Sequence, residues 1–139
     1  MAYSRDLKSA ARRYLKAAQF LHAHVAAGAQ PGCSAVAGYS YGLAGEIAVK
    51  ELMRNAGIRE LSSDRRKDDP YYAHFPTLRT LLSQQVKGRL SGKLLEISNS
   101  NKHFQNWDIA MRYAPAKDIK SNWINDWKQS AEALVGSME

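Results

Sequence analysis

The apolar residues of the first thirty positions recur at helical spacing. Between residues 4 and 27 they stand three or four positions apart, at Leu7, Ala11, Tyr14, Ala18, Leu21 and Val25. This spacing places them on one face of an α-helix. Ser4 can cap the start of that helix, and Asp6 falls in the first turn, where the helix dipole favours a negative charge. The sequence GAQPG at 28–32 predicts where the helix ends.

The stretch CSAVAGYSYGLAGEIAVKELM continues the same spacing and predicts a second, long helix. One line of small and apolar residues comprises Ala35, Gly38, Gly42, Gly45, Val49 and Leu52. A second line beside it comprises Tyr39, Leu43, Glu46 and Lys50. Gly57 followed by Ile58 is typical of a helix C-terminal cap. Each glycine inside the helix costs roughly 1 kcal/mol relative to alanine. We therefore expect the glycine face to pack closely against a neighbouring helix; the alternative is a backbone exposed to a ligand.

Charged and apolar stretches alternate through the middle of the chain. Residues 59–72 carry both signs of charge without an apolar period, which predicts a surface loop. Its basic triplet, residues 65–67, is a candidate phosphate contact or a solvated loop. Pro76 suits the first turn of a helix, and glycines at 88 and 92 loosen or end it. The apolar side of this helix comprises Leu78, Leu81, Leu82 and Val86.

The last forty-five residues predict further helical segments. After a short piece, KLLEIS, the sequence SNSN caps a helical run HFQNWDIAMRY that Pro115 stops. A final helix over 116–135 carries Ile119, Trp123, Trp127, Ala131 and Leu134 along one face. The fold class expected from these segments is all-α. We expect an up-and-down bundle of four main helices plus a short extra helix, forming one domain over residues 1–139.

The pentapeptide GYSYG at 38–42 matches the G-x-S-x-G pattern of a serine-hydrolase nucleophile elbow. That chemistry needs a strand, a sharp turn that exposes the serine and then a helix. Here Ser40 lies inside a continuous helical period. No strand precedes Gly38, and sequence order places neither His74 nor His103 beside Ser40. We therefore expect no nucleophilic role for Ser40.

Composition narrows the classes of function. The chain has 139 residues, of which 45% are hydrophobic, as expected for a globular domain with its own core. Twenty Lys and Arg against 13 Asp and Glu give a net charge of +7, which favours a polyanionic partner. The single cysteine, Cys33, and the lack of a long apolar run agree with a cytoplasmic protein without a membrane segment. We expect no metal site and no cofactor, because no His and carboxylate set has ligand-like spacing.

The order of these features resembles the HEPN superfamily of helical domains. The resemblance spans nearly the whole chain through SAARRYLKAAQFL, AVAGYSYGLAGEIAVKELMRNAG, AHFPTLRTLL and MRYAP. It implies a bundle of four or five helices and frequent dimerisation, beside nucleotidyltransferases or in RNA-cutting systems. Many ribonuclease members carry an arginine, four to six further residues and a histidine near the last long helix. This chain lacks that pattern, so no catalytic residues carry over. What carries over is Arg112, Tyr113 and Pro115, with Ala114 as an extra residue, and His74 before the third helix.

Two groups of basic residues are the candidate nucleic-acid or nucleotide contacts. The first comprises Arg112, Tyr113 and Lys117, joined by His74, and the second comprises Arg5, Arg12 and Lys16 on the first helix. Each group can also have a purely structural role. Arg112 can pair with Asp108 one turn earlier while Tyr113 is a core residue, and His74 can be a capping or core histidine. The stripe on the first helix can be a solvated face.

The sequence thus favours a non-catalytic HEPN-like binding module. We expect it to form a homodimer and to engage RNA, a nucleotide or a partner protein, such as a nucleotidyltransferase or an antitoxin. The context would be prokaryotic defence, a toxin-antitoxin pair or regulation. One alternative is a divergent metal-independent ribonuclease whose site joins Arg112, Tyr113 and His74 across a dimer. The other is a structural helical adaptor that uses its tryptophans.

Overall fold

The computed structural model describes residues 3–26, 33–85, 92–99 and 102–138, and within them it is all-α. The α-helices are α1 (Leu7–Ala26), α2 (Cys33–Asn55), α3 (Thr77–Gln85), α4 (Gly92–Asn99) and α5 (Ser121–Gly136). Short 3-10 turns are η1 (Ser63–Asp68), η2 (Pro70–Tyr72), η3 (Ile109–Tyr113) and η4 (Ala116–Asp118). The all-α helical bundle expected from the sequence is confirmed.

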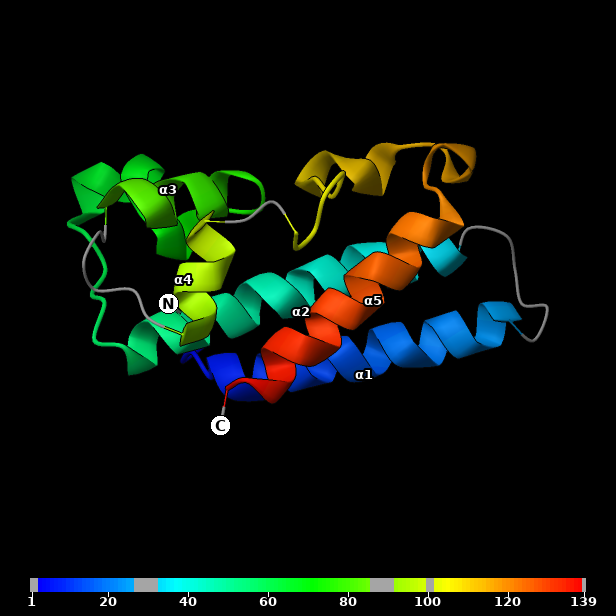
Figure 1. Ribbon diagram of the computed structural model, residues 1–139, viewed down its shortest axis with the longest axis horizontal. Coiled ribbons are helices and arrows are strands. Elements are labelled where there is room, and N and C mark those ends of the chain that lie inside the picture. Colours follow the sequence, from blue (N-terminus) through cyan, green and yellow to red (C-terminus); the bar gives the residue numbers. More distant parts are fainter. Residues whose placement is uncertain (1–2, 27–32, 86–91, 100–101, 139) are drawn as a thin grey trace.

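The three long helices form the body of the bundle. α1 and α2 lie side by side and antiparallel, and α5 packs across both of them (Figure 1). The short helices α3 and α4 cover the C-terminal end of α2. Residues 102–120 return along the molecule to the other end, so α5 runs in the same general direction as α2. This return segment forms one side of the cavities described below.

α2 is the central element, because neighbours cover it on several sides. Both lines of residues that the sequence places on it are wholly or partly buried, as expected for a helix enclosed by others. Its end is a Schellman-type cap. Gly57 has φ +81°, and the Ile58 amide donates to the Met53 carbonyl at 3.0 Å. The predicted long helix and its cap are thus confirmed.

α1 begins at Leu7 rather than at residue 4, and its buried face differs in one position from the expectation. Ala11 and Ala18 are fully buried, whereas Tyr14 is 39% exposed. Leu15 packs against the core instead. The buried face of α1 is thus rotated slightly from the expected one, toward Leu15. Val25, GAQPG, Val86 and Gly88 lie outside the described side chains.

The prediction of a helical run over residues 103–113 is wrong. Phe104 and Asn106 have positive φ values of 58° and 67°, and only Ile109–Tyr113 forms a 3-10 turn. Such φ values cost a residue with a side chain about 1–3 kcal/mol each, and they persist only where the surrounding structure fixes them. The surroundings here are the core, since Phe104 and Trp107 are almost fully buried. The last helix also begins later than predicted, at Ser121, after the separate turn η4.

The glycine face of α2 seats aromatic rings. A Cβ on Gly42 would stand 2.0 Å from the Trp107 indole, and one on Gly45 would stand 2.3 Å from the Phe104 ring. Gly38 faces Trp127 of α5 at 2.9 Å. Close packing is therefore confirmed as the reason for these glycines. A helix supplies the neighbour only at Gly38; the return segment supplies it at the other two positions.

Candidate functional site

Two adjoining cavities lie between the residues that lead into α3 and the return segment. The first, which we call the basic lobe, has a volume of about 260 Å³ and includes Arg66, Lys67, Tyr72, His74 and Thr77 in its wall. The second, the wide lobe, measures about 600 Å³. Its wall comprises Pro76, Arg79, Phe104, Gln105, Asn106, Trp107 and Asp108. Pro76 and Asp108 belong to both walls, so the two lobes adjoin at these residues, and we call the two lobes together the groove.

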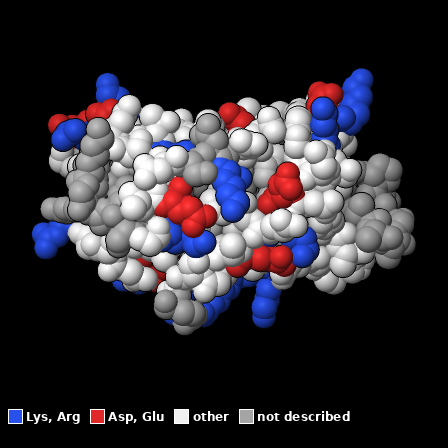
Figure 2. All heavy atoms as spheres, viewed as in Figure 1, with Lys and Arg blue, Asp and Glu red and all other residues white. Residues whose placement is uncertain are grey.

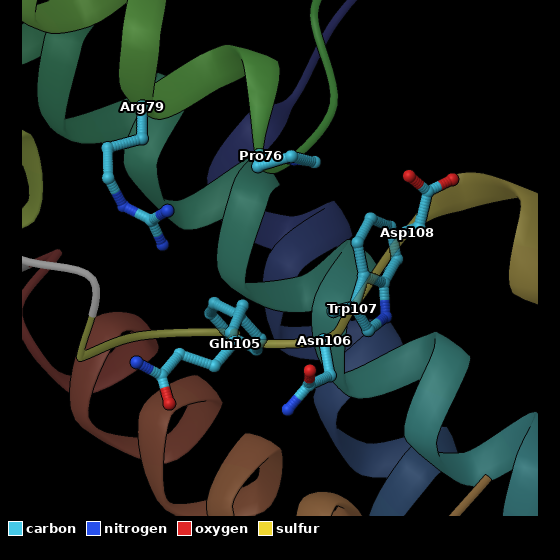
Figure 3. Close-up of a pocket in the computed structure, with 7 residues that line it drawn as sticks. Pro76, Arg79, Gln105, Asn106, Trp107 and Asp108 are labelled. Atoms are coloured by element: carbon cyan, nitrogen blue, oxygen red, sulfur yellow. The ribbon is translucent and has the colours of Figure 1, made fainter.

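The wide lobe combines a cation with uncharged polar groups and a carboxylate. Arg79 extends from α3 toward the segment that carries Gln105 and Asn106, and Asp108 stands at the other end of the cavity (Figure 3). One carboxylate oxygen of Asp108 accepts the Ala110 amide at 2.8 Å and starts η3. The lining of the wide lobe therefore includes hydrogen-bond donors and acceptors from α3 and from the return segment.

Arg79 is the unusual member of this wall. It is partly buried, and burial alone lowers the pKa of its guanidinium. Its Nη2 donates to the carbonyl of His103, its side chain lies over the Phe75 ring at 5.5 Å, and its buried Nε has no hydrogen-bond partner. Among the residues that the structure describes, no carboxylate forms an ion pair with it. A partly buried cation without a counter-ion is unfavourable in the free protein and suits a site that binds an acceptor-rich ligand.

The basic lobe is organised around Tyr72. Arg66 lies over the Tyr72 ring at 4.9 Å from its centroid, and Arg5 lies over the same ring at 5.3 Å. Arg5 also donates to the Tyr72 hydroxyl at 3.0 Å and forms an ion pair with Glu60. These contacts raise the pKa of Arg5, so it remains a cation. Arg5, predicted from the sequence as part of a stripe on α1, thus lies next to this lobe.

His74 contacts a buried carboxylate behind the wall. Its Nδ1 lies 2.7 Å from Glu46 Oε2, and Lys50 Nζ lies 3.8 Å from the same oxygen. Glu46 is only 1% exposed, and its other oxygen, Oε1, has no hydrogen-bond partner. Burial raises the pKa of Glu46, while the neighbouring Lys50 and His74 oppose that rise. Because Glu46 engages Nδ1, Nε2 of the 46%-exposed His74 side chain is left for solvent or a ligand. His74 is therefore not a core residue, although its carbonyl does cap α3 by accepting the Leu78 amide.

Arg112 lines a different, smaller cavity, and Tyr113 is its neighbour in the chain. This cavity has a volume of about 200 Å³ and a largely apolar wall that includes Val36, Tyr39 and Met111. Arg112 hydrogen-bonds Tyr39, which raises its pKa, and lies over the Tyr113 ring at 4.8 Å. Asp108 instead caps η3, and Tyr113 is 79% exposed. The alternative that Arg112 pairs with Asp108 while Tyr113 fills the core is therefore not what the structure shows.

The remaining predicted contacts are spread over the surface. Lys117 is exposed in η4, and Arg12 and Lys16 are exposed on α1. On the face shown in Figure 2, lysines, arginines and acidic residues are interspersed rather than gathered into one patch. The net charge of +7 therefore does not form a basic patch on this face, whereas the basic residues of the basic lobe lie close together. The structure brings Arg5 and His74 to one lobe and leaves Arg112, Tyr113 and Lys117 apart from it.

His103 belongs to a hydrogen-bonded link between helices. Its Nδ1 lies 2.9 Å from Ser130 Oγ of α5, and its Nε2 lies 3.1 Å from Glu96 Oε1 of α4. The histidine is 5% exposed, so both ring nitrogens are satisfied in a buried position. Ser40 lies in the middle of α2, where no strand or sharp turn exposes it. His74 instead contacts Glu46, and His103 contacts Ser130 and Glu96. The nucleophile-elbow requirement is not met.

The described residues include neither a cluster of metal ligands nor a helix that could cross a membrane. Within residues 3–26, 33–85, 92–99 and 102–138, no three His, Cys, Asp or Glu side chains are placed to hold one metal ion. The helices in these ranges include none that combines the length and the apolar character needed to cross a membrane.

Sequence reasoning did not find the wide lobe. In the sequence, Arg79 has the spacing of an exposed arginine on a helix, so nothing distinguishes it. Gln105 and Asn106 fall in a segment that the sequence predicts to be helical. The signal that was available is the basic triplet at 65–67, of which Arg66 and Lys67 line the basic lobe. Comparisons with family models, with curated proteins and with solved structures found no match for this chain.

Proposed function

We propose that this protein is a non-catalytic binding module for single-stranded RNA, which the groove holds by its phosphates and bases. The observation that carries the proposal is Arg79, a partly buried cation in the wall of a cavity of about 600 Å³, with no acidic partner among the described residues. A bound ligand with phosphate or carbonyl oxygens would supply the missing acceptors.

Four further features support a nucleic acid rather than a small anion. The cations Arg66 and Lys67, with the His74 imidazole beside them, continue the site into the basic lobe. Together the lobes exceed what a single phosphate fills, and a cationic groove of this kind suits a strand. The net charge of +7 adds a general attraction for a polyanion. The resemblance to HEPN domains points to RNA in the same way.

The proposal is tested by measuring how salt affects the binding of a fluorescein-labelled uridine dodecamer. Affinity should fall steeply as salt rises, because each neutralised phosphate releases condensed counterions. Arg79→Gln should weaken binding by about tenfold at low salt and reduce the log–log salt slope by roughly 0.7. Glutamine keeps an N–H donor for the His103 carbonyl and removes a poorly compensated charge, so the variant should fold.

Arg13→Gln is the matched control. Arg13 is exposed on α1 and lies outside both lobes, and the substitution removes the same charge. It should change affinity by less than about twofold. Equal losses in the two variants would mean that binding depends only on net charge. Absence of binding at low salt would refute RNA binding and favour the adaptor alternative.

A second candidate function is metal-independent ribonuclease activity, favoured by the contact between Glu46 and His74 at 2.7 Å. A buried carboxylate that orients an imidazole is an arrangement found in general-base catalysis. His74 Nε2 would accept the 2′-hydroxyl proton as the 2′-oxygen attacks phosphorus and the 5′-oxygen leaves, and a nearby cation such as Lys67 would stabilise the charge. Shortening of RNA in the presence of a chelator, abolished by His74→Gln and Glu46→Gln, would establish this alternative.

We further propose that the module works as a homodimer in a prokaryotic defence, toxin-antitoxin or regulatory system in the cytoplasm. A nucleotidyltransferase or an antitoxin is the expected protein partner. The support is the resemblance described above, together with exposed apolar side chains beside the Arg112 cavity, such as Val36 at 53% and Tyr113 at 79%. Light scattering of the purified chain tests dimerisation. A monomer over the concentration range of the binding assay would refute it.

A further inference from the structure

The two lobes of the groove differ in chemistry, and the difference bears on which part of an RNA strand each lobe receives. The side chains Arg66, Lys67 and His74 make the basic lobe suitable for phosphate. The wide lobe adds the amides of Gln105 and Asn106 to Arg79. Asp108, which it shares with the basic lobe, stands at its far end from Arg79 (Figure 3). A carboxylate repels phosphate but accepts hydrogen bonds from the N–H groups of a nucleobase.

Asp108 retains capacity for such a ligand. It is exposed, and only its Oδ1 is engaged, by the Ala110 amide at 2.8 Å. A carboxylate offers about four lone-pair sites, so it can accept two further N–H groups. Arg79 has the opposite need, since among the described residues its side chain hydrogen-bonds the His103 carbonyl and pairs with no carboxylate. The ligand that best complements this cavity is therefore a ring with two donors on one edge, for Asp108, and acceptors on another edge, for Arg79.

Among the four RNA bases, guanine best combines these edges. Its N1–H and N2 amino group present two neighbouring donors, which pair with a carboxylate, and its O6 and N7 present two neighbouring acceptors, which pair with arginine. Adenine and cytosine offer one amino group next to an acceptor, and uracil offers a single N–H. A volume of about 600 Å³ exceeds that of one base, and Pro76 with the edges of Phe104 and Trp107 provides apolar surface for it.

We infer that the wide lobe is a guanine-binding subsite, in which Asp108 accepts from the N1 and N2 groups of the base and Arg79 donates to O6 and N7. The inference rests on the proposed function and specifies its sequence preference. The neighbouring basic lobe would hold a phosphate of the same strand.

The test compares labelled uridine hexamers that carry guanosine, inosine, adenosine or cytidine at the third position, measured by fluorescence anisotropy at one salt concentration. We expect the guanosine hexamer to bind about tenfold more tightly than the all-uridine hexamer. Inosine lacks the N2 amino group and should lie between them. Asp108→Asn should reduce the guanosine preference to below about twofold. Because the substitution also removes a carboxylate that repels phosphate, all-uridine binding should become equal or somewhat tighter, and the ratio of the two affinities is the quantity that tests the subsite. Asparagine also caps a helical turn, so η3 should be retained.

Asp118→Asn is the matched control, because Asp118 is an exposed aspartate of η4 that lines neither lobe. It should leave the guanosine preference unchanged. If all hexamers bind equally and Arg79→Gln weakens them all, RNA binding stands and the guanine subsite is refuted. If no hexamer binds, both proposals are refuted together. A preference that persists in Asp108→Asn also overturns the inference, since another group would then read the base.

Discussion

Substituting alanine for Gly42 tests whether the glycine face of α2 seats the return segment. The added Cβ would stand 2.0 Å from Cε2 and Nε1 of Trp107 and 2.6 Å from its Cδ1, far inside van der Waals contact. Trp107 is 2% exposed, and the Tyr39 ring stacks on it with centroids 5.8 Å apart. The indole is therefore confined between α2 and Tyr39, and its open side is the wide lobe, whose wall it helps to form. Either the ring leaves its position or the return segment separates from α2.

The size of the effect follows from opposing contributions. Alanine favours the helix over glycine by about 1 kcal/mol. Overpacking a core costs about 1–3 kcal/mol, and full removal of a buried aromatic side chain costs about 3–5 kcal/mol. Partial displacement of Trp107 lies between these costs. We expect Gly42→Ala to lower the free energy of unfolding by about 2–3 kcal/mol, which corresponds to a melting temperature lower by roughly 6–10 °C for a chain of this length.

Gly136→Ala is the matched control for this measurement. Gly136 is the last residue of α5, and a Cβ there meets no atom within 4 Å. Its substitution should change stability by less than about 1 kcal/mol, or raise it slightly through the unfolded chain. Thermal melts by circular dichroism and urea titrations followed by tryptophan fluorescence report the two variants. A Gly42→Ala melting temperature equal to or above that of the wild type would refute the seating of Trp107.

Three further predictions concern chemistry rather than packing. A fluorophosphonate serine probe should leave Ser40 unlabelled, and stoichiometric labelling that disappears in Ser40→Ala would restore the hydrolase hypothesis. Burial raises the pKa of Tyr41 and of Tyr71 to about 12. The folded protein therefore holds these protons longer than the unfolded chain, and the stability they contribute should be lost as pH rises from about 10 to 12; an unchanged loss in Tyr41→Phe would contradict this for Tyr41. Arg112→Ala should weaken RNA binding by about threefold without unfolding the domain, less than Arg79→Gln, because Arg112 lies outside the groove; an equal or larger loss would move the main contact to the Arg112 cavity.

Local sequence signals were sufficient where one helix determines its own limits. The spacing of α2 and the glycine at position 57 predicted both its length and its cap. They were misleading for the return segment. Phe104, Trp107 and Met111 are all buried and stand three and four residues apart, which is the helical repeat. The positive φ values at Phe104 and Asn106 arise from packing against α2, some sixty residues earlier, and tertiary contacts of this kind override local propensity.

The candidate site depends on the same long-range packing. His74 and the basic triplet could be identified because their residue types suggest phosphate binding wherever they lie. Arg79 could not, since its significance comes from partial burial opposite a segment twenty-five residues later. Only the path of the return segment determines that Gln105 and Asp108 join Arg79 in one cavity.

The glycine face of α2 links the stability of the fold to the groove. Gly42 and Gly45 seat Trp107 and Phe104, and the same two aromatic residues belong to the wall of the wide lobe. The packing of these two rings fixes the position of the intervening backbone, and Gln105 and Asn106 on that backbone line the wide lobe. A larger residue on that face would displace the aromatic rings that form the wall of the wide lobe, and it would also strain the core. The feature that first resembled a hydrolase motif is thus a packing surface, and through the aromatic rings it shapes the site where we propose that RNA binds.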